Sequence, residues 1–168
     1  FDISKTYFSI IIMTSIIHYN NIVPKNNIAA FDLDHTIIEP TLGKIFPKDI
    51  HDWILKENVL NVLTELAKKE WSIVIFTNQR SKKITDKELY EKFSCISESF
   101  PFPISFISGR KYDYSSKPHS GMWYYYLKDF KYEKAFYCGD AFLNDNVLKA
   151  SDLKFAYNCN IPFIKNTD

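Results

Sequence analysis

Two carboxylates and a hydroxyl stand at alternate positions in residues 29–38, as Asp32, Asp34 and Thr36. They follow an apolar run that ends at Asp32, a pattern typical of a buried parallel strand whose carboxyl end feeds a site. In extended backbone, side chains two residues apart share one face, unless the chain coils there. Carboxylates so close repel each other, so we expect a cation beside them, and Mg²⁺ suits hard oxygen ligands. A polar turn without chemistry is the alternative interpretation.

Thr77 and Lys117 are candidates to hold a phosphate group near these carboxylates. Thr77 ends the apolar run at residues 72–76, where its hydroxyl and the adjacent backbone N–H groups can bind phosphate oxygens. Lys117 lies in a loop after the third apolar run, and a cation is needed there to offset a phosphate and the aspartates. Taken singly, each also fits an ordinary strand-end threonine or a solvated loop lysine.

Further acidic residues follow the fourth apolar run. Asp140 comes directly after Gly139, and Asp145 lies five residues further on. Together with Asp32, they can supply carboxylates to a magnesium shell that water and a backbone carbonyl complete. We predict Asp32, Asp34, Asp140 and Asp145 as the metal-site residues. Asp152 competes with Asp145 for the last acidic position.

Apolar runs alternate with segments of helical periodicity along the chain. Strands are predicted at residues 28–32, 72–76, 104–107, 135–138 and 155–157, and helices at 59–67, 85–93 and 120–130. This alternation favours an α/β fold with a parallel sheet of about five strands, covered by helices on both faces. Ligands bind at the carboxyl ends of such strands, which is where the polar groups above fall. Asn58 is predicted to cap the first helix, and residues 39–44 to form a turn or flap.

Length and composition set the expected organisation. A chain of 168 residues has room for one domain with a real core. We expect residues 28–163 to form that core and residues 1–27 to be an N-terminal extension, with a strand in the Ile-rich segment 7–17. That segment is about half as long as a membrane span and lacks the marks of a signal peptide, so no membrane partner is expected. We expect a monomer.

Charge and cysteine content say little about partners but favour one kind of compartment. The net charge of +1 gives no global basic field, so contacts with nucleic acid must rest on local patches. The three cysteines, Cys95, Cys138 and Cys159, are scattered and show no metal-type pairing. An odd, unclustered set favours a reducing intracellular compartment.

Asp-x-Asp-x-Thr after an apolar strand resembles the first motif of the haloacid dehalogenase superfamily. Later motifs are similar to the phosphatase domain of polynucleotide kinase 3'-phosphatases: Phe-Pro at 46–47, Ile-Phe-Thr-Asn-Gln at 75–79, Lys-Pro at 117–118, Gly-Met-Trp at 121–123 and Gly-Asp-Ala at 139–141. The resemblance extends over residues 28–163. It implies a Rossmann-like three-layer sandwich with a minimal cap, Mg²⁺ as cofactor, and removal of 3'-phosphates from DNA ends in strand-break repair.

The same resemblance assigns roles to the candidate catalytic residues. Asp32 is expected to attack phosphorus and form an aspartyl-phosphate, which divides one difficult displacement into two. Asp34 is expected to protonate the leaving oxygen and then to activate water. Thr77 and Lys117 complete the predicted catalytic set.

The sequence also departs from the family pattern. His35 stands where the family commonly has Gly. The segment after Asp140 is shorter than in many relatives, which leaves the choice between Asp145 and Asp152 open. No Gly-x-x-x-x-Gly-Lys-[Ser/Thr] stretch is present, so no ATP-binding kinase half is expected within this sequence.

Basic and amide side chains in the loops are candidates to bind a DNA 3' end at a single strand, nick or break. We predict Asn78, Arg80, Lys82 and Arg110 as substrate-binding residues, because loop cations can contact backbone phosphates. Ordinary solvated charges are the alternative. Trp53, Trp123 and Tyr124 are candidates to stack on a terminal base, with a core role favoured for Trp123.

Two other functions stay open. One is a small-molecule phosphatase of the same superfamily, of the histidinol-phosphate type, although such relatives often carry a cysteine-rich zinc loop that this sequence lacks. The other is a non-catalytic module that binds DNA ends. Retention of Asp32, Asp34, Lys117 and Asp140 argues against it, because an unused acidic cluster costs stability.

Overall fold

The computed structural model describes residues 15–41, 47–142 and 150–166. Its centre is a six-stranded sheet in the order β1-β6-β5-β2-β7-β8. Neighbouring strands are parallel except for β1, which pairs antiparallel with β6 at one edge. The strands of this sheet are β1 Ile16–Tyr19, β2 Asn27–Phe31, β5 Trp71–Asn78, β6 Ser105–Gly109, β7 Lys134–Gly139 and β8 Phe163–Lys165.

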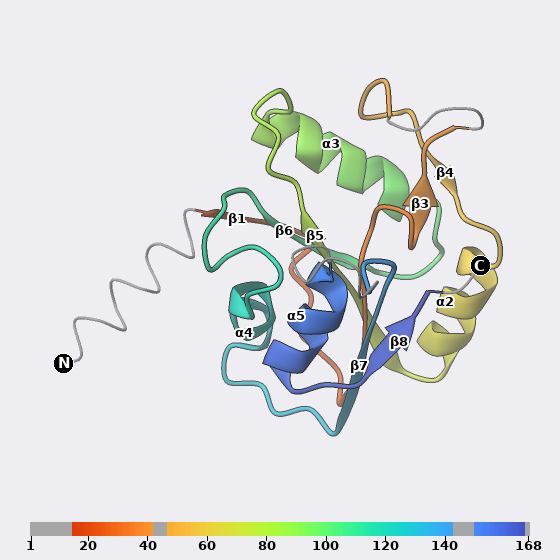
Figure 1. Ribbon diagram of the computed structural model, residues 1–168. Coiled ribbons are helices and arrows are strands. Elements are labelled where there is room, and N and C mark those ends of the chain that lie inside the picture. The colour runs from red at the N-terminus through yellow and green to blue at the C-terminus, as the bar shows by residue number, and fades with distance from the viewer. Residues whose placement is uncertain (1–14, 42–46, 143–149, 167–168) are drawn as a thin grey trace.

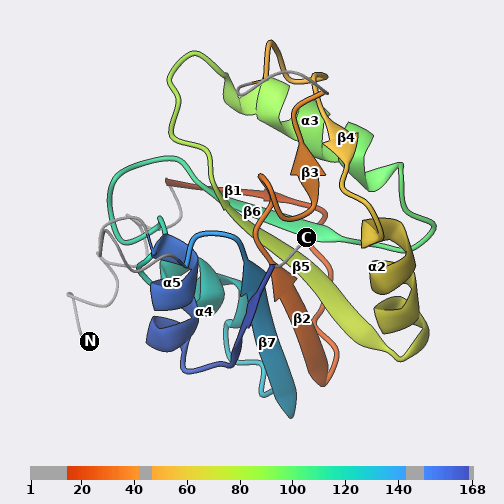
Figure 2. The same ribbon diagram turned by 45° about the vertical axis from the view of Figure 1, so that its right-hand side comes forward.

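Helices cover both faces of the sheet and make a three-layer sandwich, as predicted (Figures 1 and 2). The helices are α2 Val59–Lys68, α3 Asp86–Ser97, α4 Gly121–Leu127 and α5 Ser151–Cys159. In Figure 2, α2 and α3 lie to the right of the sheet and α4 and α5 to the left. The fold is therefore a mixed α/β architecture with a mostly parallel central sheet.

Alternation along the central strands divides the core in two. In β5, Ile73 and Ile75 pack in the cluster on the α2–α3 face, and Val74 and Phe76 pack in the cluster on the α4–α5 face. Because both faces are buried, the strand reads as a continuous apolar run, as parallel strands under two helical layers do. Each such large apolar side chain contributes about 1.5–3 kcal/mol by leaving water.

Two elements near the C-terminus differ from the sequence prediction. The predicted strand at residues 155–157 is wrong: Phe155 and Ala156 lie in α5, where they are buried together with Cys159 at helical spacing. An apolar triplet is compatible with either structure, and packing of one helix face against β7 decides it. The last strand is instead β8, which sequence reasoning missed because it has three residues and follows a proline.

Local signals explain the helix starts. Thr85 caps α3 through a capping box in which its hydroxyl accepts from the Glu88 N–H while the Glu88 carboxylate accepts from the Thr85 N–H. The helix then extends beyond the predicted residue 93 and buries Leu89, Phe93 and Ile96. Asn58 does precede α2, but its backbone is left-handed (φ 64°) and its side chain makes no capping bond.

Two short segments outside the main sheet lie beyond the carboxyl ends of its strands (Figure 2). Strands β3 Ile38–Glu39 and β4 Ile54–Leu55 pair antiparallel. Of the turn or flap predicted at residues 39–44, residues 42–44 lie outside the described residues. Most of the N-terminal segment in which a strand was predicted falls outside the described residues, and Ile16 and Ile17 belong to β1. Among the described residues, every helix is too short or too polar to cross a membrane.

Candidate active site

The polar residues gather where β2, β5 and β7 end. These three strands are neighbours in the sheet and parallel, so their carboxyl ends meet at one edge. Asp32 directly follows β2, Asp140 directly follows β7, and Thr77 is the penultimate residue of β5. The loop between β6 and α4 adds Lys117. This is the edge at which ligands bind in open parallel sheets.

Lys117 is the centre of a buried hydrogen-bond network. Its Nζ donates to Asp32 Oδ1 (2.6 Å), Asp152 Oδ1 (2.7 Å) and the Tyr137 hydroxyl (2.8 Å). The Tyr137 hydroxyl in turn donates to Asp152 Oδ1 (2.8 Å). Burial alone would lower the pKa of Lys117, but the charges of Asp152 and Asp32 outweigh burial and raise it. Lys117 is therefore a fixed cation beside the Asp32 carboxylate.

Three carboxylates meet around that one lysine. Each of Asp32, Asp140 and Asp152 offers an oxygen, and these oxygens lie within 4.8 Å of one another. Burial, opposed by Lys117, raises the pKa of Asp32 well above its ordinary value. Burial also raises the pKa of Asp140, with the charge of Asp152 adding to the effect. The cluster carries more negative charge than Lys117 neutralises, and its donors are hard oxygens, so its residues fit a divalent cation such as Mg²⁺.

Asp152 reaches this cluster because α5 packs closely against the end of β7. A Cβ on Gly139 would lie 2.6 Å from the Asp152 carboxyl carbon, so only glycine permits the approach. The other oxygen of Asp152 accepts from the Ala141 N–H (3.0 Å). Of the two candidates for the last acidic position, Asp152 lies in the site, and Asp145 lies outside the described residues.

The chain coils tightly after Asp32. The Leu33 carbonyl accepts from the N–H groups of residues 36, 37 and 38, and His35 has a left-handed backbone (φ 62°). A left-handed position favours glycine, although histidine adopts it more readily than most residues. Lys56 and Asn166 both donate to the His35 carbonyl and hold the loop in place.

Coiling separates the three side chains that an extended strand would place on one face. Asp32 is buried in the cluster, and Asp34 is half-buried and accepts from the Gln79 side-chain amide (2.8 Å). The same Gln79 amide donates to the Thr77 hydroxyl (2.9 Å). Thr36 is buried apart from them, and among the described residues its hydroxyl has no hydrogen-bond partner.

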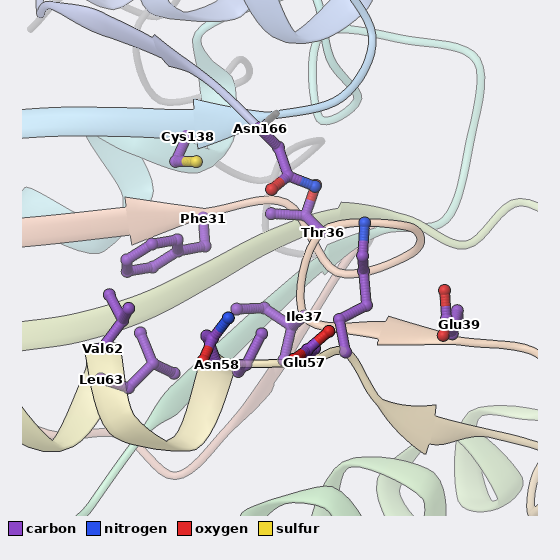
Figure 3. Close-up of a pocket in the computed structure, with 12 residues that line it drawn as sticks. Phe31, Thr36, Ile37, Glu39, Glu57, Asn58, Val62, Leu63, Cys138 and Asn166 are labelled. Carbon is purple, nitrogen blue, oxygen red and sulfur yellow. The ribbon is translucent and has the colours of Figure 1, made fainter. Parts of the chain in front are cut away.

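Thr36 instead lines a cavity of about 410 Å³ beside α2 (Figure 3). Apolar side chains from β2 and α2, including Phe31, Val62 and Leu63, form one side, and Glu39, Glu57, Asn58 and Asn166 give it polar groups. The cavity shares the loop at residues 33–38 with the acidic cluster. Asp32, Asp140 and Asp152 are not among its lining residues.

The predicted substrate-binding residues fall into two groups. Asn78 and Arg110 hold loops: Asn78 bonds both the N–H and the carbonyl of Lys117, and Arg110 donates to the carbonyls of Gln79 and Ile84. Arg110 also pairs with Asp86. Arg80 and Lys82 lie nearer to solvent, with Lys82 exposed and the Arg80 guanidinium over the ring of Tyr112.

Two members of the site gave weaker signals in the sequence. Tyr137 looks like any aromatic residue of a core strand, and its hydroxyl contact with Lys117 depends on packing across 20 residues of sequence. Gln79 belongs to the quoted Thr-Asn-Gln motif, but nothing in the motif shows that its amide bonds Asp34. Trp123, considered for base stacking, is fully within the α4–α5 core, and Trp53 packs against the α2–α3 core.

Comparison with known proteins agrees with this geometry. A family model described as polynucleotide kinase 3 phosphatase matches residues 27–167. A bifunctional polynucleotide phosphatase/kinase of Schizosaccharomyces pombe is 34% identical over 153 residues, which cover 86% of this chain and 38% of that protein. An uncharacterized 20.8 kDa protein of Autographa californica nuclear polyhedrosis virus is 35% identical over 151 residues, with 83% of this chain and 82% of that protein covered.

The fold has solved relatives as well. The structure of D,D-heptose 1,7-bisphosphate phosphatase from B. bronchiseptica, complexed with magnesium and phosphate, superimposes with a TM-score of 0.64 at 16% identity. The superposition covers 82% of this chain and 78% of the heptose-bisphosphate phosphatase chain. At this level of identity, the likeness shows the fold alone. Since the family model spans most of the sequence, this chain belongs to the polynucleotide kinase 3 phosphatase family.

Proposed function

We propose that this protein is a magnesium-dependent phosphatase that removes 3'-phosphates from polynucleotide ends through an aspartyl-phosphate. The observation that carries the proposal is the placement of Asp32. Its carboxylate lies at the end of a buried parallel strand, 2.6 Å from the Lys117 ammonium and beside two further carboxylates. A carboxylate held in this way can act as a nucleophile toward phosphorus.

In the first half-reaction, an oxygen of Asp32 attacks the phosphorus atom, and the bond from phosphorus to the 3'-oxygen breaks. Asp34 gives its proton to that oxygen, which leaves as a 3'-hydroxyl. Gln79 holds Asp34 for this role through its amide. The Thr77 hydroxyl and the Lys117 ammonium stabilise the charge on the other phosphate oxygens.

In the second half-reaction, water attacks the phosphorus of the aspartyl-phosphate. Asp34, now ionised, takes a proton from that water as it attacks. The bond between phosphorus and Asp32 breaks, which regenerates the carboxylate and yields inorganic phosphate. The same residue acts first as an acid and then as a base because its proton leaves in one step and returns in the other.

Asp32, Asp140 and Asp152 supply the acidic environment that would hold Mg²⁺. When bound, the ion would offset the negative charge of the phosphate and of the three carboxylates, so that these groups can occupy the site together. The donor set supports this assignment, because three carboxylate oxygens lie close together and, among the contacts of the described residues, only two of these carboxylates accept from the Lys117 ammonium.

Family membership and the short insertions near the site support a polynucleotide substrate. The S. pombe relative is named a polynucleotide phosphatase/kinase, and this chain spans 38% of its length. Between β2 and α2, the described part of the insertion holds only the small β3–β4 ribbon, so a polymer end has room to approach. Removal of 3'-phosphates would make DNA ends fit for strand-break repair.

Phosphate release from matched substrates tests the proposal. The panel contains an oligonucleotide with a 3'-phosphate, the same oligonucleotide with a 5'-phosphate, and histidinol phosphate. We expect magnesium-dependent release from the 3'-phosphate alone, with turnover reduced at least 10³-fold in Asp32→Asn, because an amide cannot form the acyl-phosphate. Preferred release from histidinol phosphate would favour a small-molecule phosphatase, and binding of DNA ends without release would favour a non-catalytic module.

A further inference from the structure

An aromatic side chain and a guanidinium group stack at the edge of the site. Tyr112 lies in the loop between β6 and α4, and the Arg80 Cζ atom lies 3.9 Å from the centre of its ring. Tyr112 remains 84% exposed although Arg80 covers it, so the opposite ring face is open to solvent. The contact with the Arg80 guanidinium gives this exposed ring a preferred orientation.

The two loops that carry this pair are fixed to each other and to the site. They leave β5 and β6, which are neighbouring strands, at the same edge of the sheet (Figure 1). Arg110 bonds the carbonyls of Gln79 and Ile84 in one loop, and Asn78 bonds the backbone of Lys117 in the other. Within the second loop, Ser116 donates to the Lys111 carbonyl.

Both members of the pair belong to segments that also contact the reacting groups. Arg80 directly follows Gln79, whose side-chain amide donates to Asp34. Tyr112 lies in the same loop as Lys117, which contacts Asp32. The pair is therefore joined through short stretches of backbone to residues of the catalytic site.

An exposed aromatic ring with cations beside it is a combination that binds single-stranded nucleic acid. Every base has a flat face that stacks on an aromatic ring whatever its sequence, and each stacked base contributes about 1–3 kcal/mol. Cations beside the ring bind the backbone, and Lys82, Lys83 and Lys111 are exposed in the same two loops.

We propose that Tyr112, held from behind by Arg80, is a stacking platform for the unpaired terminal base of a 3'-phosphorylated strand. This inference rests on the function proposed above. It adds that the protein recognises the last base by its flat face, and that the base must be free of its complement. A terminal base in a blunt duplex must first unpair, which costs a few kcal/mol.

Kinetics with a matched pair of tyrosines tests the platform. Tyr112→Ala should raise KM for a single-stranded 3'-phosphorylated oligonucleotide by about 5- to 150-fold. Tyr112→Phe keeps the ring and should retain wild-type KM. Tyr157, which is 83% exposed on α5, is the control, and Tyr157→Ala should have no effect.

A second substrate separates stacking from general damage. With an oligonucleotide whose 3'-terminal nucleotide lacks its base, the KM of wild type should rise, because no base stacks on the ring. On that strand Tyr112→Ala should have the same KM as wild type. Equal losses on the complete and the abasic strands would assign Tyr112 to loop structure and overturn the proposal, as would an unchanged KM in Tyr112→Ala. Failure of wild type to release any 3'-phosphate would instead overturn the proposed function, and the platform with it.

Discussion

Lys117 brings a single positive charge to a site that holds three close carboxylates. Two of these, Asp32 and Asp152, accept from the same ammonium group. Asp152 therefore helps to position Lys117 beside Asp32. Burial raises the pKa of Asp32 and of Asp140 above their ordinary values, and the negative charge of Asp152 adds to the effect at both.

Asp34→Asn should affect the two kinds of leaving group differently. A 3'-hydroxyl must be protonated as it departs, whereas nitrophenolate leaves without a proton. We expect the first step with a 3'-phosphorylated oligonucleotide to slow about 10²–10⁴-fold, and the burst of nitrophenolate from nitrophenyl phosphate to change less than about tenfold. Rapid-mixing kinetics of both substrates measures this. Equal losses would show that Asp34 has a positioning role only.

Asp152→Asn should weaken the use of magnesium. The change removes one charge from the cluster and replaces one of the two oxygens that accept from the Lys117 ammonium and the Ala141 N–H by an NH₂ group. We expect the Mg²⁺ concentration for half-maximal phosphate release to rise about 10- to 100-fold. Tyr137→Phe, which removes only a hydroxyl from the same network, is the matched control and should have a smaller effect. An unchanged magnesium requirement in Asp152→Asn would exclude Asp152 from the metal environment.

Several site residues were predictable because parallel strands deliver their carboxyl ends to one edge. Asp32 and Asp140 are more than 100 residues apart in sequence, with Thr77 between them. All three nevertheless lie at the carboxyl ends of parallel strands in one sheet. Asp152 was only one of two candidates, because it comes from a helix whose packing against β7 is a long-range property. Tyr137 was not predictable, since its hydroxyl acts across two elements.

At the scale of elements, the edge strand β1 shows a titratable group in an unusual setting. His18 lies on β1, and its Nδ1 contacts the Tyr125 hydroxyl (3.3 Å), while its Nε2 is buried with no partner. Burial, with the charge of Lys128 adding, lowers the pKa of His18 from 6.5 to about 4. The folded protein therefore holds this ring neutral at a pH where the unfolded chain protonates it.

His18 should make the fold less stable as the pH falls. Between pH 6.5 and about 4, the unfolded chain binds a proton that the folded protein does not, so the free energy of unfolding declines across this window. Because part of the ring is exposed to solvent, we expect a contribution of roughly 1–2 kcal/mol. His18→Phe should remove that part of the decline, measured by urea unfolding at pH 7.5 and 4.5.

The exposed His119 provides the control for this measurement. His119→Phe makes the same change of residue type at an exposed position. If His18→Phe and wild type lose the same stability between the two pH values, His18 is not the group responsible.

The elements also mark where sequence patterns are ambiguous. The strands buried on both faces were recognised because their apolar runs are bounded by turn residues. The strand predicted at residues 155–157 is wrong because an apolar triplet fits strand and helix alike. The helical period becomes visible only in the burial of residues 152, 155, 156 and 159 along one face of α5. Asn58 has the residue type of a cap but not the backbone of one.

At the scale of the whole molecule, the proposed chemistry and the proposed substrate contacts share one edge of the sheet. The net charge of +1 gives no general attraction to nucleic acid, so the binding proposed above must rest on local groups. The loops after β5 and β6 carry the stacked pair of Arg80 and Tyr112, and the second of these loops also carries Lys117, which contacts Asp32. In the proposed function, the same two loops contribute both substrate contacts and a catalytic cation.

Trapping the covalent intermediate tests the central claim most directly. The protein is mixed with Mg²⁺ and an oligonucleotide labelled in its 3'-phosphate, quenched rapidly in acid, and mapped by peptide. We predict label on the peptide that contains Asp32, with none in Asp32→Asn and none from an oligonucleotide labelled in its 5'-phosphate. Release of labelled phosphate by Asp32→Asn at the wild-type rate, with no label on the protein, would contradict the account.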